Sequence, residues 1–179
     1  IGHEALSGED AGYLNTAIGF RALKVQDAGN AYNTAVGANA GLSMTTGVQN
    51  TLVGAQAGDS LTTGTNNVAI GFEALATEDE HSFNVAVGHR ALKTQNAGAS
   101  AYNTAVGYNT GLNVTTGIFN TLIGGFAGDA LTVGNSNVVV GYDALSSEQQ
   151  GDRNVAVGFK ALQNQNNTSS TDVYNTAVG

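Results

Sequence analysis

A five-residue motif recurs along this chain at nearly constant spacing, and this repetition limits the possible folds more than any other feature. "NTAVG" stands at 33–37, 103–107 and 175–179, with close variants such as "NTAIG" at 15–19 and "NVAIG" at 67–71. The motif glycines from Gly2 to Gly179 are separated by 17, 18, 17, 17, 17, 19, 17, 17, 17 and 21 residues. A period of this size is typical of repeat architectures. We therefore expect one repeat domain over residues 1–179, with about ten units of about 17 residues.

Each motif has the composition of a short β-strand. Its second residue is Thr or Val, its third is Ala, Leu or Val, and its fourth is Ile or Val, between Asn and Gly. β-Branched residues favour strands, whereas Asn and Gly favour turns. A unit has room for two short strands and two turns, which is too little for a propeller blade, and no apolar stripe of helical period is present. The chain is therefore predicted to be an all-β parallel β-solenoid with one unit per coil.

The motif Asn and Gly residues are interpreted as architectural. Stacked coils would place the Asn side chains in a column that hydrogen-bonds along the axis, and Gly would permit a sharp bend at positive φ. The predicted Asn column is Asn15, Asn33, Asn50, Asn67, Asn84, Asn103, Asn120, Asn137, Asn154 and Asn175. The predicted turn glycines are Gly19, Gly37, Gly54, Gly71, Gly88, Gly107, Gly124, Gly141 and Gly158.

The two faces of the strand predict a surface for association. Side chains alternate along a strand, so the second and fourth motif residues share one face and the third lies on the other. The fourth residue, always Ile or Val, is assigned to the inside of the coil. The third would then form an exposed apolar strip that three-fold association covers. The alternative, Ala tolerated at the surface, fits Leu52, Leu122 and Val139 poorly. The predicted trimer face is Ala17, Ala35, Leu52, Ala69, Ala86, Ala105, Leu122, Val139, Ala156 and Ala177.

The motifs resemble those of known fibre proteins. "NVAIG" at 67–71 and "NVAVG" at 84–88 and 154–158 resemble the head repeats of YadA-type trimeric autotransporter adhesins, and "NTAVG…TTG…NTLVG" is similar to bacteriophage and bacterial tail-fibre repeats. The resemblance implies a left-handed β-roll, three chains around one axis, and a non-enzymatic fibre segment that presents or spaces a receptor-binding element. It also implies an extracellular location, on a cell surface or in a virion fibre, and a cell-surface receptor or glycan as a partner. The units here are longer than those of YadA-type heads.

Composition excludes several other classes of protein. Six Lys and Arg stand against 14 Asp and Glu, which gives a net charge of -8 and disfavours nucleic acid as a partner. No apolar run approaches the roughly 20 residues of a membrane helix, so we expect no membrane insertion by this segment. The chain has no Cys, which excludes disulfides and thiolate metal sites.

No catalytic, cofactor-binding or metal-binding residue is predicted, and the chain is not expected to be an enzyme. His3 and His89 follow a motif glycine where other units carry Phe or Tyr, so we interpret them as ring substitutes. The acidic clusters Glu9–Asp10 and 78–80 lack the alternating oxygen ligands of a calcium loop and are interpreted as a solvated charged edge.

Three further interpretations stay open. The polar connections "KVQDAGNAY", "KTQNAGASAY" and "QNQNNTSSTDVY" lengthen along the chain and are a candidate contact surface, unless loop length is simply tolerated there. An ice-binding solenoid would use a Thr column that Val68, Val85, Val138 and Val155 interrupt. A polysaccharide-binding or -processing scaffold is the third alternative, although no paired carboxylates recur.

Overall fold

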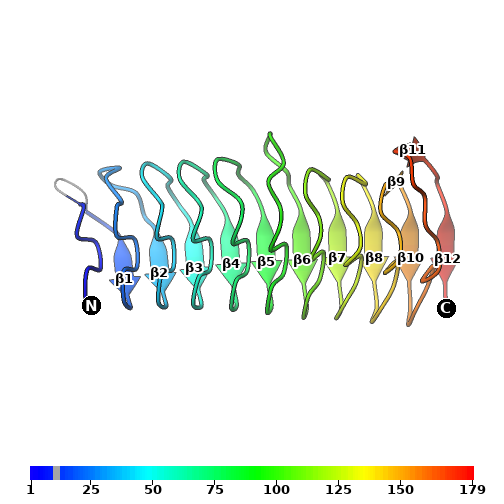
Figure 1. Cartoon of the computed structure of the whole chain (residues 1–179), viewed down its shortest axis with the longest axis horizontal. Coiled ribbons are helices and arrows are strands. Elements are labelled where there is room, and N and C mark those ends of the chain that lie inside the picture. Colours follow the sequence, from blue (N-terminus) through cyan, green and yellow to red (C-terminus); the bar gives the residue numbers. More distant parts are fainter. Residues whose placement is uncertain (10–12) are drawn as a thin grey trace.

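The chain folds into an all-β parallel solenoid. The computed structural model describes residues 1–9 and 13–179, and its coils follow one another along a single axis from the N-terminus to the C-terminus (Figure 1). The predicted fold of about 10 coils spaced about 17 residues apart is confirmed. Asp10, part of one acidic cluster discussed above, lies outside the described residues.

Ten three-residue strands make one parallel sheet, in the order β1-β2-β3-β4-β5-β6-β7-β8-β10-β12. They are β1 (Thr16–Ile18), β2 (Thr34–Val36), β3 (Thr51–Val53), β4 (Val68–Ile70), β5 (Val85–Val87), β6 (Thr104–Val106), β7 (Thr121–Ile123), β8 (Val138–Val140), β10 (Val155–Val157) and β12 (Thr176–Val178). A separate ladder pairs β9 (Gly151–Asp152) with β11 (Thr171–Asp172). The expected second strand per coil is therefore present only here within the described residues.

The coils stack in one constant register. Ala35 pairs with Leu52, and Leu52 in turn pairs with Ala69, so residues at the same motif position lie above one another. The register holds across the longer unit between β5 and β6, because the extra residues extend from the solenoid as a loop (Figure 1). Each motif position therefore becomes a column that runs along the rod.

The hydrophobic core is a narrow column inside the coils. The third motif residue of each strand packs there against Ala and Leu residues that follow the motif glycine, such as Leu23 and Leu75. Leu52 is accommodated because Gly41 and Gly58 leave space for it: a Cβ at either glycine would lie 2.8 or 2.9 Å from a Leu52 methyl carbon. Large and small residues thus complement one another along the core.

The described part of the chain contains no helix of the length and apolar character that a membrane span requires.

Candidate functional site: the outer face of the sheet

The assignment of the two strand faces in the sequence analysis is wrong. The third motif residue lies inside the coil of a single chain, and the second and fourth residues lie outside it. Nine of the ten residues predicted as the trimer face are buried: Ala17, Ala35, Leu52, Ala69, Ala86, Ala105, Leu122, Val139 and Ala156. The tenth, Ala177, is half-buried and packs against the same core. These residues are therefore not available to another chain. The physical reason is volume, since the coil is too narrow for two facing columns of large side chains and Ala fits opposite Leu.

The outer face of the sheet carries two columns of mainly apolar side chains. One column is the Thr or Val at the second motif position, and the other is the Ile or Val at the fourth. Members of the fourth-position column are Ile18, Val36, Val53, Ile70, Val87, Val106, Ile123, Val140, Val157 and Val178. Ile18, Ile70, Val106 and Ile123 are between 37% and 42% exposed, a large fraction for aliphatic side chains. A continuous strip of this kind is typical of an interaction surface.

A column of aromatic rings borders one side of this face, directly after the motif glycine or, for Phe126, one residue further along the chain. From Phe72 to Phe159 the rings form an unbroken ladder with centroid separations of 5.0 to 5.9 Å. His89 stacks between Phe72 and Tyr108, and His3 stacks on Phe20 at 5.6 Å. The interpretation of both histidines as ring substitutes is confirmed.

A second, interrupted aromatic column borders the other side, directly before the motif Asn. Phe83, Tyr102 and Phe119 stack there with centroid separations of 4.9 and 5.6 Å. All three have positive φ, between 52° and 66°, which turns their exposed rings outward before the strand begins. The outer face is therefore an apolar strip with aromatic rims.

The motif Asn residues form a hydrogen-bonded column. From Asn15 to Asn137, the side-chain Oδ1 of each accepts the backbone N–H of the Asn in the next coil at 2.7 to 3.2 Å. The side-chain Nδ2 of Asn50 also donates to the carbonyl of Gly64, which fixes the turn of its own coil. The last member, Asn175, is exposed and donates instead to Gln165.

The motif glycines are required by both conformation and space. Gly19 to Gly158 have φ between 128° and 144°, a range that L-residues rarely adopt. A Cβ at Gly71 would lie 2.3 Å from the carbonyl oxygen of Gly88 in the next coil. The close approach of successive coils at this corner therefore depends on glycine.

Ion pairs link neighbouring coils through the charged residues that follow the aromatic rings in the sequence. Glu4 pairs with Arg21 at 2.8 Å and Lys24 at 3.0 Å, and Glu73 pairs with Arg90 and Lys93, both at 2.7 Å. Hydrogen bonds from Lys93 and Arg90 hold the pKa of Glu73 below its usual value. These pairs are partly exposed, so they favour coil register more than overall stability.

A buried polar cluster occupies the inner corner before the Asn column. Gln95 Nε2 donates to Glu78 Oε2 at 3.1 Å and to Asn84 Oδ1 at 2.9 Å. The same arrangement recurs 70 residues later, where Gln165 Nε2 donates to Glu148 Oε2 at 2.8 Å and Asn154 Oδ1 at 3.0 Å. Burial acts to raise the pKa of Glu148, but hydrogen bonds from Gln165 and the backbone N–H of Gly151 outweigh it, so the pKa lies below its usual value.

The longer connections project from the solenoid. The loop between β5 and β6 and the segment that carries β11 both extend beyond the neighbouring coils (Figure 1). Arg153 pairs with Asp172 and lies over the ring of Tyr174 at 5.5 Å, which ties the last of these loops to the coil before it. No pocket is found within the described residues.

Comparisons with known protein families, curated proteins and solved structures find no significant match. The resemblance of the motifs to YadA-type heads and tail-fibre repeats therefore stays a prediction.

Proposed function

We propose that the chain is a non-enzymatic segment of a homotrimeric structural or adhesive fibre, which presents or spaces a receptor-binding element for attachment to a cell or host. The observation that carries this proposal is the outward column of Ile and Val from Ile18 to Val178, with its Thr and Val neighbour. Covering apolar surface contributes about 25 cal/mol per Å². Because the strip recurs in every coil, covering it would stabilise the assembly along the whole rod.

The occupant that fits this strip is a second and third copy of the same chain. Rotation about a three-fold axis that runs parallel to the rods and between them places identical columns against one another, keeps the chains parallel, and covers the strip on every chain. The aromatic columns on either side would form the rim of each contact. On this proposal the interface consists of the second and fourth motif residues, in place of the third.

The projecting loops are the proposed contact surface of the fibre. They lie away from the sheet, so trimer formation through its outer face leaves them exposed (Figure 1). A cell-surface receptor or glycan is the corresponding partner, and the place of action is extracellular, on a cell or a virion.

The molar mass of the chain in solution tests the trimer. Light scattering after size exclusion at micromolar concentration should give three times the 18.1 kDa of one chain. Ile70→Glu should dissociate the assembly and leave the circular dichroism unchanged, because three carboxylates would meet in an apolar interface while the side chain lies outside the coil. Thr116→Glu, at an exposed turn, should change neither property.

The outcome for Ala86→Glu separates this interface from the one expected from sequence. Ala86 is fully buried in its own chain, so the substitution should unfold the protein at any concentration. A wild-type protein that stays a folded monomer at micromolar concentration would reject the trimer.

The outward Thr residues favour ice binding as a second candidate function. Thr34, Thr51, Thr104 and Thr121 lie on the outer face of the sheet, although Val residues interrupt their column. Thermal hysteresis from a folded monomer would support this candidate over the fibre.

A further inference from the structure

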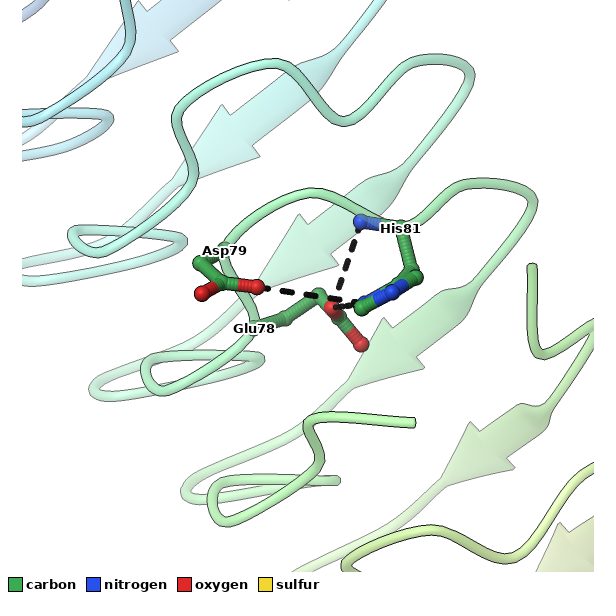
Figure 2. A group of neighbouring side chains, drawn as sticks. All are labelled: Glu78, Asp79 and His81. Carbon is green, nitrogen blue, oxygen red and sulfur yellow. Dashed lines mark hydrogen bonds and ion pairs between the residues drawn. The ribbon is translucent and has the colours of Figure 1, made fainter. Parts of the chain in front are cut away.

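One turn of the solenoid gathers three side chains that are common metal ligands. Ligand atoms of Glu78, Asp79 and His81 all lie within 4.8 Å of one another (Figure 2), the one such group in residues 1–9 and 13–179. The Glu78 side chain is fully buried, while those of His81 and Asp79 are 14% and 45% exposed. The group therefore joins an interior carboxylate to two ligands that solvent can reach.

The second copy of this turn, 70 residues later, shows how the same buried carboxylate is satisfied without an imidazole. Glu148 accepts the backbone N–H groups of Gln150, Gly151 and Asn167, and the amides of Gln165 and Asn167. Glu78 accepts one backbone N–H, that of His81 at 3.3 Å, and the amide of Gln95. Its remaining partner is the ring of His81, with Nδ1 2.5 Å from Oε1.

Histidine stands at a position that carries glycine in the equivalent turns. A Cβ at Gly64 would lie 2.5 Å from the carbonyl oxygen of His81 in the next coil, and a Cβ at Gly134 would lie 2.6 Å from that of Gly151. At Gly151 itself, the nearest atoms to such a Cβ are those of the Glu148 carboxylate, at 2.9 to 3.0 Å. A side chain at this position is thus directed at the buried carboxylate, and in the coil of Glu78 that side chain is an imidazole.

We propose that Glu78, Asp79 and His81 bind a divalent transition-metal ion of the Zn²⁺ type. Imidazole nitrogen and carboxylate oxygen are both ligands of Zn²⁺ in proteins, and a site with three protein ligands leaves the fourth position to water. Ligand atoms around tetrahedral Zn²⁺ lie roughly 3 to 3.5 Å apart, so shifts of about 1 Å would complete the site. The metal ion would take the place of the direct contact between His81 Nδ1 and Glu78 Oε1.

Outer hydrogen bonds already orient two of the ligands. Gln95 Nε2 donates to Glu78 Oε2 at 3.1 Å, and the backbone N–H of Glu80 donates to Asp79 Oδ1 at 2.7 Å. Such bonds hold ligands in place and support metal affinity. The imidazole favours Zn²⁺ over Ca²⁺ and Mg²⁺, which prefer sites made only of oxygen.

Calorimetric titration of the chain with ZnCl₂ tests the site. We expect one Zn²⁺ per chain with micromolar or tighter affinity and a rise in the melting temperature, whereas CaCl₂ and MgCl₂ should give neither. The double variant Asp79→Gln, His81→Gly introduces the equivalents of Gln149 and Gly151. It should keep the fold, because the backbone N–H groups of residues 80 and 81 can donate to Glu78 as those of Gln150 and Gly151 do to Glu148, beside the Gln95 amide. Its Zn²⁺ affinity should fall at least about tenfold.

A second histidine variant controls for binding elsewhere. His89→Phe keeps a ring in the aromatic ladder and should bind Zn²⁺ as the wild type does. The proposal is overturned if the folded wild type takes up no Zn²⁺ at micromolar concentration, or if the double variant binds as tightly as the wild type.

Discussion

Asn120 and Asn137 are joined through a single oxygen atom: Asn120 Oδ1 accepts both the backbone N–H of Asn137 at 2.9 Å and its side-chain Nδ2 at 3.1 Å. Within its own coil, Asn120 Nδ2 donates to the carbonyl of Gly134 at 2.9 Å. One buried side chain thus fixes a turn and connects two coils. No smaller residue can make both contacts.

Asn120→Ala should lower the free energy of unfolding by about 2–4 kcal/mol, because it leaves the buried N–H of Asn137 and the carbonyl of Gly134 without partners. Urea denaturation measures the change. Asn175→Ala, at the exposed end of the same column, should change stability by less than about 0.5 kcal/mol. Equal losses in the two variants would contradict a role for the buried column.

Gly71→Val should destabilise the protein by about 3 kcal/mol or more, since it combines a strained φ with a clash between coils. The φ of Gly71 is 136°, and its Cβ would lie 2.3 Å from the Gly88 oxygen. Gly98 also has positive φ, at 69°, but has no atom within 4 Å of such a Cβ, so Gly98→Asn should cost little. Similar melting temperatures for the two variants would argue against this packing.

Leu52→Ala should destabilise each chain by about 3–5 kcal/mol, because Gly41 and Gly58 leave nothing to fill the resulting cavity. Val25→Ala, at an exposed position outside the core, should cost less than about 1 kcal/mol. The loss from Leu52→Ala should not depend on protein concentration, since Leu52 packs within one chain. A loss that vanishes at high concentration would place Leu52 between chains instead.

Asp129 should make stability decrease as pH rises. Burial, together with the charge of Asp143, raises its pKa to about 6 from the usual 3.8, and its Oδ1 has no hydrogen-bond donor. The folded state therefore binds more protons than the unfolded state between these values. Its contribution to stability is greatest below about pH 4 and is lost as pH rises through about 6.

Asp129→Asn should remove this contribution, so the melting temperature of the variant relative to the wild type should increase between about pH 4 and about pH 7. The lowered pKa values of Glu73 and Glu148 act in the opposite direction, and both proteins retain them. The difference between the two profiles therefore isolates Asp129. A constant difference would show that its carboxyl group titrates alike in both states.

The period, the strands and the positions of Asn and Gly could be predicted from sequence because these residues act on the backbone of their own or the next coil. The first and fifth motif residues, such as Asn67 and Gly71, have the same local functions in every unit. Which face of the strand lies inside the coil could not be predicted in this way, since the third and fourth motif residues are both apolar. Volume decides between them, and the usable signal was the presence of Gly41 and Gly58 around Leu52.

The cluster at Glu78 can be recognised only in the folded turn. In the sequence, Glu78, Asp79 and Glu80 form an acidic run, and its interpretation as a solvated charged edge is wrong for Glu78, whose side chain is fully buried. Only the turn brings the His81 ring onto this carboxylate. Two features of the sequence pointed there: His81 replaces a periodic glycine, and Gln95 follows Glu78 at 17 residues as Gln165 follows Glu148.

The constant register of the coils determines how the rod would respond to force. The hydrogen bonds between neighbouring coils run along the rod axis, so a pull on its two ends loads every bond of one inter-coil step together. A coil inside the rod is released only when the steps on both of its sides fail, and the remaining coils can then stay stacked. Each such event would lengthen the rod by about 50 Å of extended chain. The stack can therefore absorb mechanical work one coil at a time and keep its two ends connected.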